Sequence, residues 1–170
     1  QSLQPQTVET SKKKACLVGI NYTGSRYELN GCVNDVIKLR DLLISQYEYD
    51  SKDIHTLTNA NASRNNILEE FTQLVQNANV GDTLFFSFSG HGIYTRDRNQ
   101  DEQDGQDEMI VGADFRCIKD DELKSILQRY LKKGVTLFTL FDNCHSGTVL
   151  DLRYQYLKNG EGSLIVHSNC

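Results

Sequence analysis

One histidine and one cysteine follow two apolar runs of the sequence, each in a glycine-containing segment. His91 stands in Ser-Gly-His-Gly after the run 83–88, and Cys144 stands in Asp-Asn-Cys-His-Ser-Gly after the run 135–141. A thiol beside an imidazole is an activated nucleophile, because the imidazole takes the thiol proton and later protonates a leaving group. We therefore interpret Cys144 and His91 as the candidate pair of a Cys–His hydrolase.

Other chemistries fit these residues less well. Taken singly, a cysteine at a strand end is most often a small buried apolar residue, and a lone histidine is most often structural. A cysteine-based phosphatase would need an arginine six residues after Cys144, where Leu150 stands. A zinc site of His91, Cys144 and His145 is disfavoured because the adjacent Cys144 and His145 would point in different directions. The segment from Gly90 lacks the third glycine of a dinucleotide fingerprint.

The elements that must position these residues alternate between strands and helices. Short apolar runs predict strands at 15–20, 54–57, 83–88, 109–113 and 135–141, and an edge strand at 164–166. Apolar residues at helical spacing predict helices at 31–46, 63–78 and 120–131. Ser63 and Asp120 are the expected caps of the second and third helices. This alternation predicts a mostly parallel sheet with helices on both faces.

In open sheets of this kind, ligands bind at the carboxyl ends of the strands. Asp35, His91 and Cys144 follow three predicted strands and therefore stand at that edge. His91 lies between two glycines and Gly147 follows Cys144 by three residues, which lets backbone N–H groups approach a ligand closely. The joint pattern is therefore more specific than either residue alone.

Composition restricts the partners. The chain has 170 residues, with 18 lysines and arginines, 23 acidic residues and a formal net charge of -5. That length indicates one domain, and no apolar run approaches the roughly 18–20 residues that span a bilayer. An acidic chain is poorly suited to nucleic acid and better suited to a basic partner or a metal cation. We expect no nucleic-acid partner and no membrane partner.

The cysteines are scattered, odd in number and without a CxxC pair; they are Cys16, Cys32, Cys117, Cys144 and Cys170. This pattern favours free thiols in a reducing, cytoplasmic compartment over a disulfide framework or a structural zinc site. Residues 1–12 show no periodicity and are predicted to form a flexible arm. Residues 13–170 are predicted to form one catalytic domain.

Several motifs, in order, resemble the metacaspases, a family of caspase-like cysteine peptidases. His91 precedes Cys144 by about 50 residues, as in caspase-like proteases, and the form Asp-Asn-Cys-His-Ser-Gly resembles that of the metacaspases. The segments 31–35, 114–115 and 151–152 extend the resemblance. It implies a caspase-like α/β/α sandwich around a mostly parallel sheet. It also implies a calcium-stimulated endopeptidase that cleaves protein or peptide substrates after arginine or lysine.

The resemblance also implies roles for particular residues. Cys144 would be the nucleophile and His91 the general base and acid, with the backbone N–H groups of Gly92 and Cys144 holding the oxyanion. The substrate pocket would be lined by Cys32, Asp35, Ser89 and Asp142. Its carboxylates suit a basic substrate side chain. Without the resemblance, Asp35 would be an ordinary acidic residue in the first turn of a helix.

Calcium is the implied cofactor. The aspartates that match the family's calcium-binding residues are Asp107, Asp120, Asp121 and Asp151. Hard cations prefer such carboxylate oxygens, and an ion there would order the acidic loop beside the site. The plainer interpretation is a solvated acidic loop beside a helix cap.

The chain departs from the family's pattern at its C-terminus. The family's chain continues past the catalytic cysteine into a small-subunit region, which we expect to be missing here or supplied separately. The resemblance implies a monomer. Two other functions stay open: a catalytically idle caspase-like scaffold, and a redox-sensing thiol protein built on Cys144, with Cys32 as a thiol that the fold could bring close to it.

Overall fold

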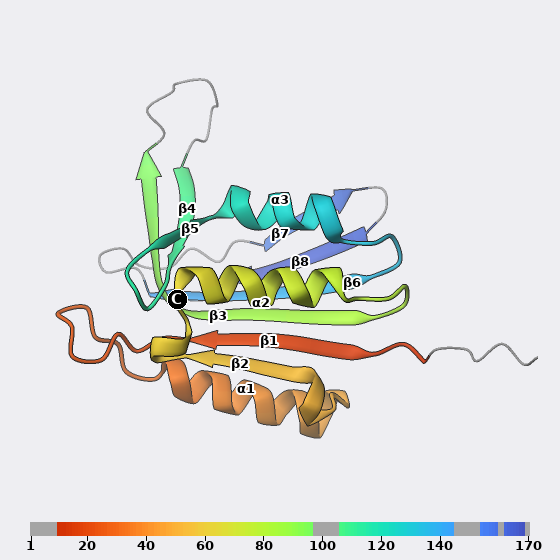
Figure 1. Cartoon of the computed structure of the whole chain (residues 1–170), viewed down its shortest axis with the longest axis horizontal. Coiled ribbons are helices and arrows are strands. Elements are labelled where there is room, and N and C mark those ends of the chain that lie inside the picture. Colours follow the sequence, from red (N-terminus) through yellow and green to blue (C-terminus); the bar gives the residue numbers. More distant parts are fainter. Residues whose placement is uncertain (1–9, 97–105, 145–153, 160–161, 169–170) are drawn as a thin grey trace, which may run out of the picture.

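The computed structural model describes the backbone of residues 10–96, 106–144, 154–159 and 162–168, and the side chains of 10–93 and 108–143 (Figure 1). The strands of this part are β1 Lys13–Gly19, β2 Ile54–Thr58, β3 Thr83–Arg96, β4 Gln106–Val111, β5 Cys117–Lys119, β6 Thr136–Cys144, β7 Tyr154–Asn159 and β8 Gly162–Ser168. The α-helices are α1 Cys32–Tyr47, α2 Arg64–Gln76 and α3 Asp120–Tyr130, and the 3₁₀ turns are Ser51–Asp53 and Asn59–Asn61. Among these residues, no helix has the length and apolar character to cross a bilayer.

The strands of the main sheet stand in the order β2-β1-β3-β6-β8-β7. Every neighbouring pair in it is parallel except β7 and β8, which form an antiparallel hairpin. The prediction of a mostly parallel sheet is therefore confirmed. The predicted edge position of 164–166 is wrong, because β7 folds back on β8 and takes the outer place.

β3 is longer than the apolar run that predicts it. The strand continues through the Ser-Gly-His-Gly segment to Arg96. Up to His91 it pairs with β6, and from Gly92 onward it pairs antiparallel with β4, which in turn pairs with β5. His91 therefore stands where one strand passes from the main sheet into a small second sheet.

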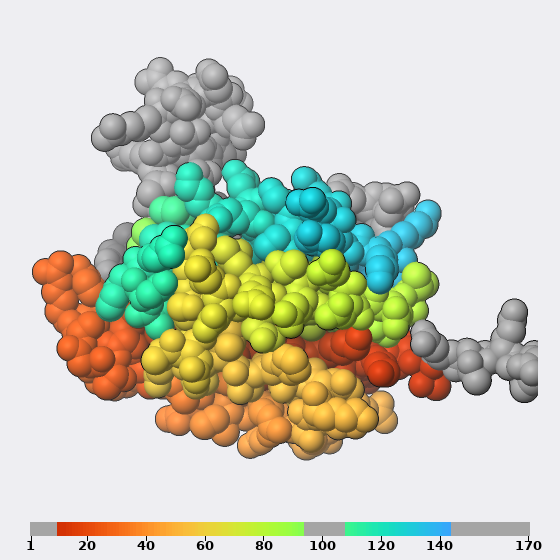
Figure 2. Space-filling view, viewed as in Figure 1, coloured from red at the N-terminus to blue at the C-terminus, as the bar shows by residue number. Residues whose placement is uncertain are grey.

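Helices cover both faces of the sheet, which confirms the α/β/α sandwich. Successive strand residues point to opposite faces. Accordingly, Ala15 and Leu17 of β1 pack under α1, whereas Cys16 and Val18 belong to the larger core under α2 and α3. In that core the rings of Phe71 and Phe86 lie 4.8 Å apart, edge to face. Figure 2 shows the side chains of α2 and α3 closing over this face.

The helix starts follow local chemistry. The Ser63 side chain accepts a hydrogen bond from the Asn66 backbone N–H at 3.3 Å, so the predicted cap of α2 is confirmed. Asp120 is the first residue of α3 and not its cap. Lys119 holds the cap position, and its backbone N–H donates to the Glu122 carboxylate at 3.0 Å.

Gly19 sets how closely α1 approaches the sheet. A Cβ atom at this position would lie 2.6 Å from the Cys32 carbonyl oxygen and 2.6 Å from a methyl group of Val36. Both residues belong to α1, and both atoms are held by helix backbone or buried packing. The absence of a side chain at Gly19 therefore lets the first turn of α1 rest directly on the carboxyl end of β1.

We expect Gly19→Ala to lower the free energy of unfolding by about 1–3 kcal/mol, because α1 must move away from β1. The measurement is urea unfolding of the purified protein. Gly24→Ala gives the cost of a strained backbone alone for comparison, since its φ is 79° and a Cβ there meets no atom within 4 Å, whereas Gly19 has no positive φ. An unchanged free energy of unfolding in Gly19→Ala would contradict the close approach of α1.

Candidate functional site

The parallel register of β3 and β6 brings the histidine and the cysteine together. Nine residue pairs run from Thr83↔Thr136 to His91↔Cys144. Neighbouring strands lie about 4.8 Å apart, so the two backbone positions are adjacent across the ladder. The side chain of Cys144 lies outside the described side chains. The backbone alone delivers the two residues to one edge of the sheet.

The His91 ring is held by two tyrosines of the segment that follows β1. Its Nε2 lies 2.7 Å from the Tyr27 carbonyl oxygen, and its ring centroid lies 4.6 Å from that of Tyr22. A carbonyl oxygen only accepts hydrogen bonds, so Nε2 must carry the proton. In the neutral ring Nδ1 then has the lone pair. Tyr27 thus selects the tautomer in which Nδ1 is the base.

The Tyr22 hydroxyl connects this histidine to the neighbouring strand. It accepts a hydrogen bond from the His91 backbone N–H at 3.0 Å and donates one to the Val111 carbonyl at 2.6 Å. A Cβ atom at Gly90 would lie only 2.9 Å from the oxygen of this hydroxyl. The glycine before His91 is therefore required by packing.

The second glycine of the motif is required by β6. A Cβ at Gly92 would lie 2.9 Å from the Cβ of Asn143. The Asn143 side chain is buried and donates from Nδ2 to the Glu108 carboxylate at 3.0 Å, which joins β6 to β4. Gly92, which makes this close contact in β3, and Cys144, which follows Asn143 in β6, are the two residues predicted to hold an oxyanion.

Beside the pair, on the α1 side, lies a cavity of about 260 Å³. Its polar lining includes Asp35 from α1, Ser89 from β3 and Asp142 from β6. Leu39, Leu42 and Leu140 supply apolar wall. Carboxylates beside an apolar wall suit a long basic side chain, whose stem is apolar and whose head is charged.

The four predicted pocket residues also influence one another electrostatically. Burial raises the pKa of the Asp142 carboxyl, and the charge of Asp35 raises it further. Burial raises the pKa of the Cys32 thiol most, the charges of Asp35 and Asp142 raise it further, and the neighbouring Ser89 side chain lowers it. Each carboxylate disfavours the ionised form of the other, so a cation placed between them stabilises both ionised forms.

Two of the predicted calcium ligands are described in full. Asp120 and Asp121 open α3, and the Asp120 carboxylate lies 2.5 Å from the Lys124 ammonium. Across β4 and β5, Met109 pairs with Lys119. The backbones of Asp107 and Asp121 therefore each lie two residues beyond this pair, on adjacent segments.

The remaining ligands cannot be placed as a set. The side chain of Asp107 and the whole of Asp151 lie outside the described residues. Within the described part, no three His, Cys, Asp or Glu side chains gather into a metal site. The carboxylates at the start of α3 are nevertheless the hard oxygen donors that Ca²⁺ prefers, so the described donors fit that ion as part of a set.

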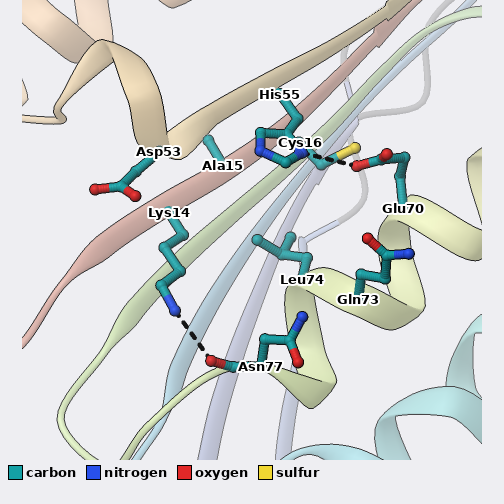
Figure 3. A pocket seen from close by; sticks show the side chains of 9 residues that line it. All are labelled: Lys14, Ala15, Cys16, Asp53, His55, Glu70, Gln73, Leu74 and Asn77. Carbon is teal, nitrogen blue, oxygen red and sulfur yellow. Dashed lines mark hydrogen bonds and ion pairs between the residues drawn. The ribbon is translucent and has the colours of Figure 1, made fainter.

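A second cavity, of about 200 Å³, lies between β1, β2 and α2, away from His91 (Figure 3). His55 and Glu70 meet across it, with Nδ1 of His55 3.0 Å from the Glu70 carboxylate. Burial, and then the charge of Glu70, raises the pKa of the Cys16 thiol to about 12. Cys16 is therefore a protonated core residue and not a nucleophile.

Some residues of the site have no role predicted from the sequence, although Phe115 and Asn143 stand in segments that resemble the family. Tyr22, Tyr27, Phe115, Asn143 and Glu108 support His91 or its strands through backbone atoms, ring contacts and a buried amide. Tyr22 and Tyr27 follow a predicted strand, as ligand-binding residues often do. This position is the only feature of the sequence that points to them. Asn143 is identifiable only as the neighbour of Cys144.

Comparison with known proteins gives a consistent result. A family model described as "Metacaspase, peptidase C14 domain" matches residues 13–153. The chain is 44% identical over 158 residues to Metacaspase-1B of Neurospora crassa, covering 88% of this chain and 37% of that protein. It is 42% identical over 160 residues to Metacaspase-1 of Saccharomyces cerevisiae, covering 89% of this chain and 37% of that protein. The chain thus spans well under half the length of these curated relatives.

A solved structure supports the same fold. A crystal structure of a Geobacter sulfurreducens protein superposes with a TM-score of 0.65 at 28% sequence identity. The match covers 89% of this chain and 57% of that one. The sheet and its helices are therefore an arrangement that other proteins share.

We expect Cys16 and Cys32 to resist alkylation in the folded protein. At pH 8 a thiol of pKa about 12 is ionised in about one molecule in 10⁴, and both side chains are buried. Iodoacetamide treatment followed by peptide mass mapping measures this, with the partly exposed Cys117 as internal reference. Labelling of Cys32 as fast as Cys117 would contradict the assignment and would favour a redox role.

Proposed function

The chain belongs to the metacaspase family of peptidases, and on that basis we propose that it carries the catalytic residues of a cysteine endopeptidase. The observation that carries the proposal is the register pair His91↔Cys144 beside a cavity with two carboxylates. In the proposed reaction Nδ1 of His91 takes the proton of the Cys144 thiol. The thiolate then attacks the carbonyl carbon of the substrate.

The later steps use the same two residues. The tetrahedral oxyanion accepts hydrogen bonds from the backbone N–H groups of Gly92 and Cys144. The C–N bond breaks, and the His91 imidazolium gives its proton to the leaving amine nitrogen. Water, deprotonated by His91, then hydrolyses the acyl-enzyme and releases the Cys144 thiol. The Tyr27 carbonyl stabilises the imidazolium by accepting from Nε2 throughout.

We propose that the cavity beside the pair binds the arginine or lysine that precedes the scissile bond. Asp35 and Asp142 supply the charge, with Ser89 and Cys32 next to them. Leu39 and Leu140 contact the apolar stem of the substrate side chain. A substrate aspartate would instead add a third negative charge.

We also propose a calcium ion near the start of α3. Asp120 and Asp121, together with Asp107 and Asp151, would hold it, and its chemistry would be to order the acidic segment beside the site. To bind calcium, Asp120 must exchange its ion pair with Lys124 for the metal. That pair is partly exposed and therefore weak, so the exchange is inexpensive.

A C-terminal small-subunit region is the other partner that we propose for the complete protein. An apolar groove of about 500 Å³ between α1 and the strands β3 and β6 is the surface that it would cover. Leu42, Tyr47, Phe85 and Phe138 line this groove, and Leu42 and Tyr47 are exposed in the described chain. The groove continues into the carboxylate cavity through Leu39 and Leu140.

The first prediction from the proposed function concerns the charge of the substrate pocket. Asp35→Asn and Asp142→Asn should each lower kcat/KM for an arginyl peptide about 30-fold or more, since a buried charge pair is worth about 2 kcal/mol or more. Initial rates with the complete protein and calcium measure this. Cys144→Ala is the blank, and Asp41→Asn on the same helix α1 is the matched control. Full activity of the Asp35 and Asp142 variants, or preferential cleavage of an aspartyl peptide, would refute the pocket assignment.

The second prediction concerns pH. The pKa of Asp142 is raised above its ordinary value of 3.8 in the free site, so its charge is lost earlier as the pH falls. The kcat/KM for arginyl peptides should therefore decline on the acidic side, beginning above the range of an ordinary aspartate. In Asp142→Asn the part of this acidic limb that arises from the pocket carboxyl should be absent, while the part that arises from protonation of the general base His91 should stay. An unchanged limb would assign the titration to another group.

The third prediction concerns calcium. Replacing Asp120 and Asp121 together by asparagine should weaken calcium binding at least tenfold, measured by calorimetry on the complete protein. Calcium should also protect the segment 97–105 from limited proteolysis, and the double variant should lose that protection. Glu48→Gln, at the far end of α1, is the control. Equal calcium affinity in the double variant and the control would exclude this site.

A further inference from the structure

Four rings form a closed cluster around the proposed catalytic histidine. His91 contacts Tyr22 and Tyr27 at centroid distances of 4.6 and 6.3 Å, and Phe115 contacts the same two tyrosines at 5.7 and 6.2 Å. We name the set Tyr22, Tyr27, His91 and Phe115 the four-ring cluster. Tyr22 is its buried floor, with 5% of its surface exposed.

The other two aromatic rings of the cluster face the solvent. Tyr27 is 46% exposed and Phe115 is 50% exposed, although Phe115 contacts the buried Tyr22 ring and Tyr27 contacts His91 and Phe115. Figure 2 shows the segment around 20–30 beside the turn at 112–116, at the carboxyl end of the strands. Exposed aromatic residues that adjoin a reactive residue mark a binding surface more often than isolated ones do.

The conformation of Phe115 is a separate observation. Its φ is 58°, which a bulky side chain rarely adopts and which costs on the order of 1 kcal/mol or more. The turn holds it there: the Phe115 N–H donates to the Gly112 carbonyl at 2.9 Å. Asp114 ties the same turn to α2 by accepting from the Arg64 N–H at 3.0 Å. An exposed ring is thus fixed in place at a conformational cost.

The carboxylate cavity and Tyr22, the floor of the four-ring cluster, belong to opposite faces of the sheet. The cavity includes Val36 and Leu39, which belong to the core under α1. Tyr22 belongs to the core under α2 and α3. A peptide with its basic residue in the cavity therefore crosses the pair and continues toward the four-ring cluster.

The chemistry of the leaving group gives the same direction. His91 must protonate the amine nitrogen released by cleavage, so that nitrogen lies within hydrogen-bonding distance of the imidazole. This nitrogen is the backbone nitrogen of the substrate residue that follows the scissile bond. Among the described residues, the exposed surface that adjoins His91 away from the cavity includes Tyr27 and Phe115.

We propose that Tyr27 and Phe115 form the subsite for the residue immediately after the scissile bond and select an apolar, preferably aromatic, side chain there. The inference rests on the proposed function and adds the second half of its specificity. The rings are held rigidly, so little ordering cost opposes binding. An aromatic side chain adds ring contacts of the kind that the cluster already makes.

The surface around Tyr27 also carries a positively charged side chain. The Arg26 guanidinium lies over the Tyr27 ring, 4.7 Å from its centroid, and donates to the Tyr27 hydroxyl. If Arg26 dominated, an acidic residue after the scissile bond would be preferred. The experiment therefore includes one.

The test uses the complete protein with calcium and four internally quenched peptides. All have arginine before the scissile bond and differ only in the next residue: phenylalanine, leucine, glycine or aspartate. The quantity measured is the ratio of kcat/KM for the phenylalanine peptide to that for the glycine peptide. We expect a ratio of about ten or more in the native protein, the size of effect that one apolar subsite gives.

The variants are Phe115→Gly, which suits the positive φ, and Tyr27→Ala, which keeps the carbonyl that accepts from His91. Both should bring the ratio close to one. Phe115→Asn, which also tolerates this φ, serves if the glycine variant is unstable. Ile37→Ala removes an apolar side chain that is 52% exposed on α1 and lines neither the cavity nor the groove, so it should keep the native ratio.

The outcomes separate the two levels of the proposal. A native ratio near one, a preference for aspartate, or a ratio unchanged in both cluster variants would overturn the subsite while the peptidase assignment stands. Cleavage of none of the four peptides would refute the proposed function, and the subsite with it.

Discussion

The parallel pairing of β3 with β6 fixes which residues meet at the site. Register in a buried parallel pair is strongly determined, because a slip by one residue would turn every apolar side chain to the other face. Leu84 and Phe86 of β3 and Leu137 of β6 are fully or almost fully buried, so the register cannot shift cheaply. The same register places His91 opposite Cys144 at the carboxyl end. Core packing thus positions the reactive pair.

The surroundings of that pair follow from close backbone packing. Gly19 lets the first turn of α1 rest on β1, which brings Asp35 toward the end of the sheet. Gly92 lets β3 pass beside Asn143. A carboxylate cavity therefore lies on the α1 side and an aromatic surface on the other. In the proposed reaction, these two surfaces hold the substrate residues on the two sides of the scissile bond.

The sequence predicts the parts that depend on local pattern. Apolar periodicity predicts the strands and helices, and the rule for strand ends singles out His91 and Cys144. The features that it misses are non-local. The extension of β3 through His91 depends on pairing with β4, and the outer position of β7 depends on a hairpin. The support from Tyr27 is a backbone carbonyl, which has no residue type, so no sequence motif can mark it.

The most direct test of the central claim is covalent capture. The central claim is that a basic substrate residue binds between Asp35 and Asp142 while Cys144 attacks the next bond. The complete protein would be treated with a peptidyl arginine chloromethyl ketone and mapped by mass spectrometry. The account predicts a single adduct on Cys144. The adduct should form much more slowly in the Asp142→Asn variant, and also more slowly when the reagent carries aspartate in place of arginine. An adduct on another cysteine, or equal rates with both reagents, would contradict it.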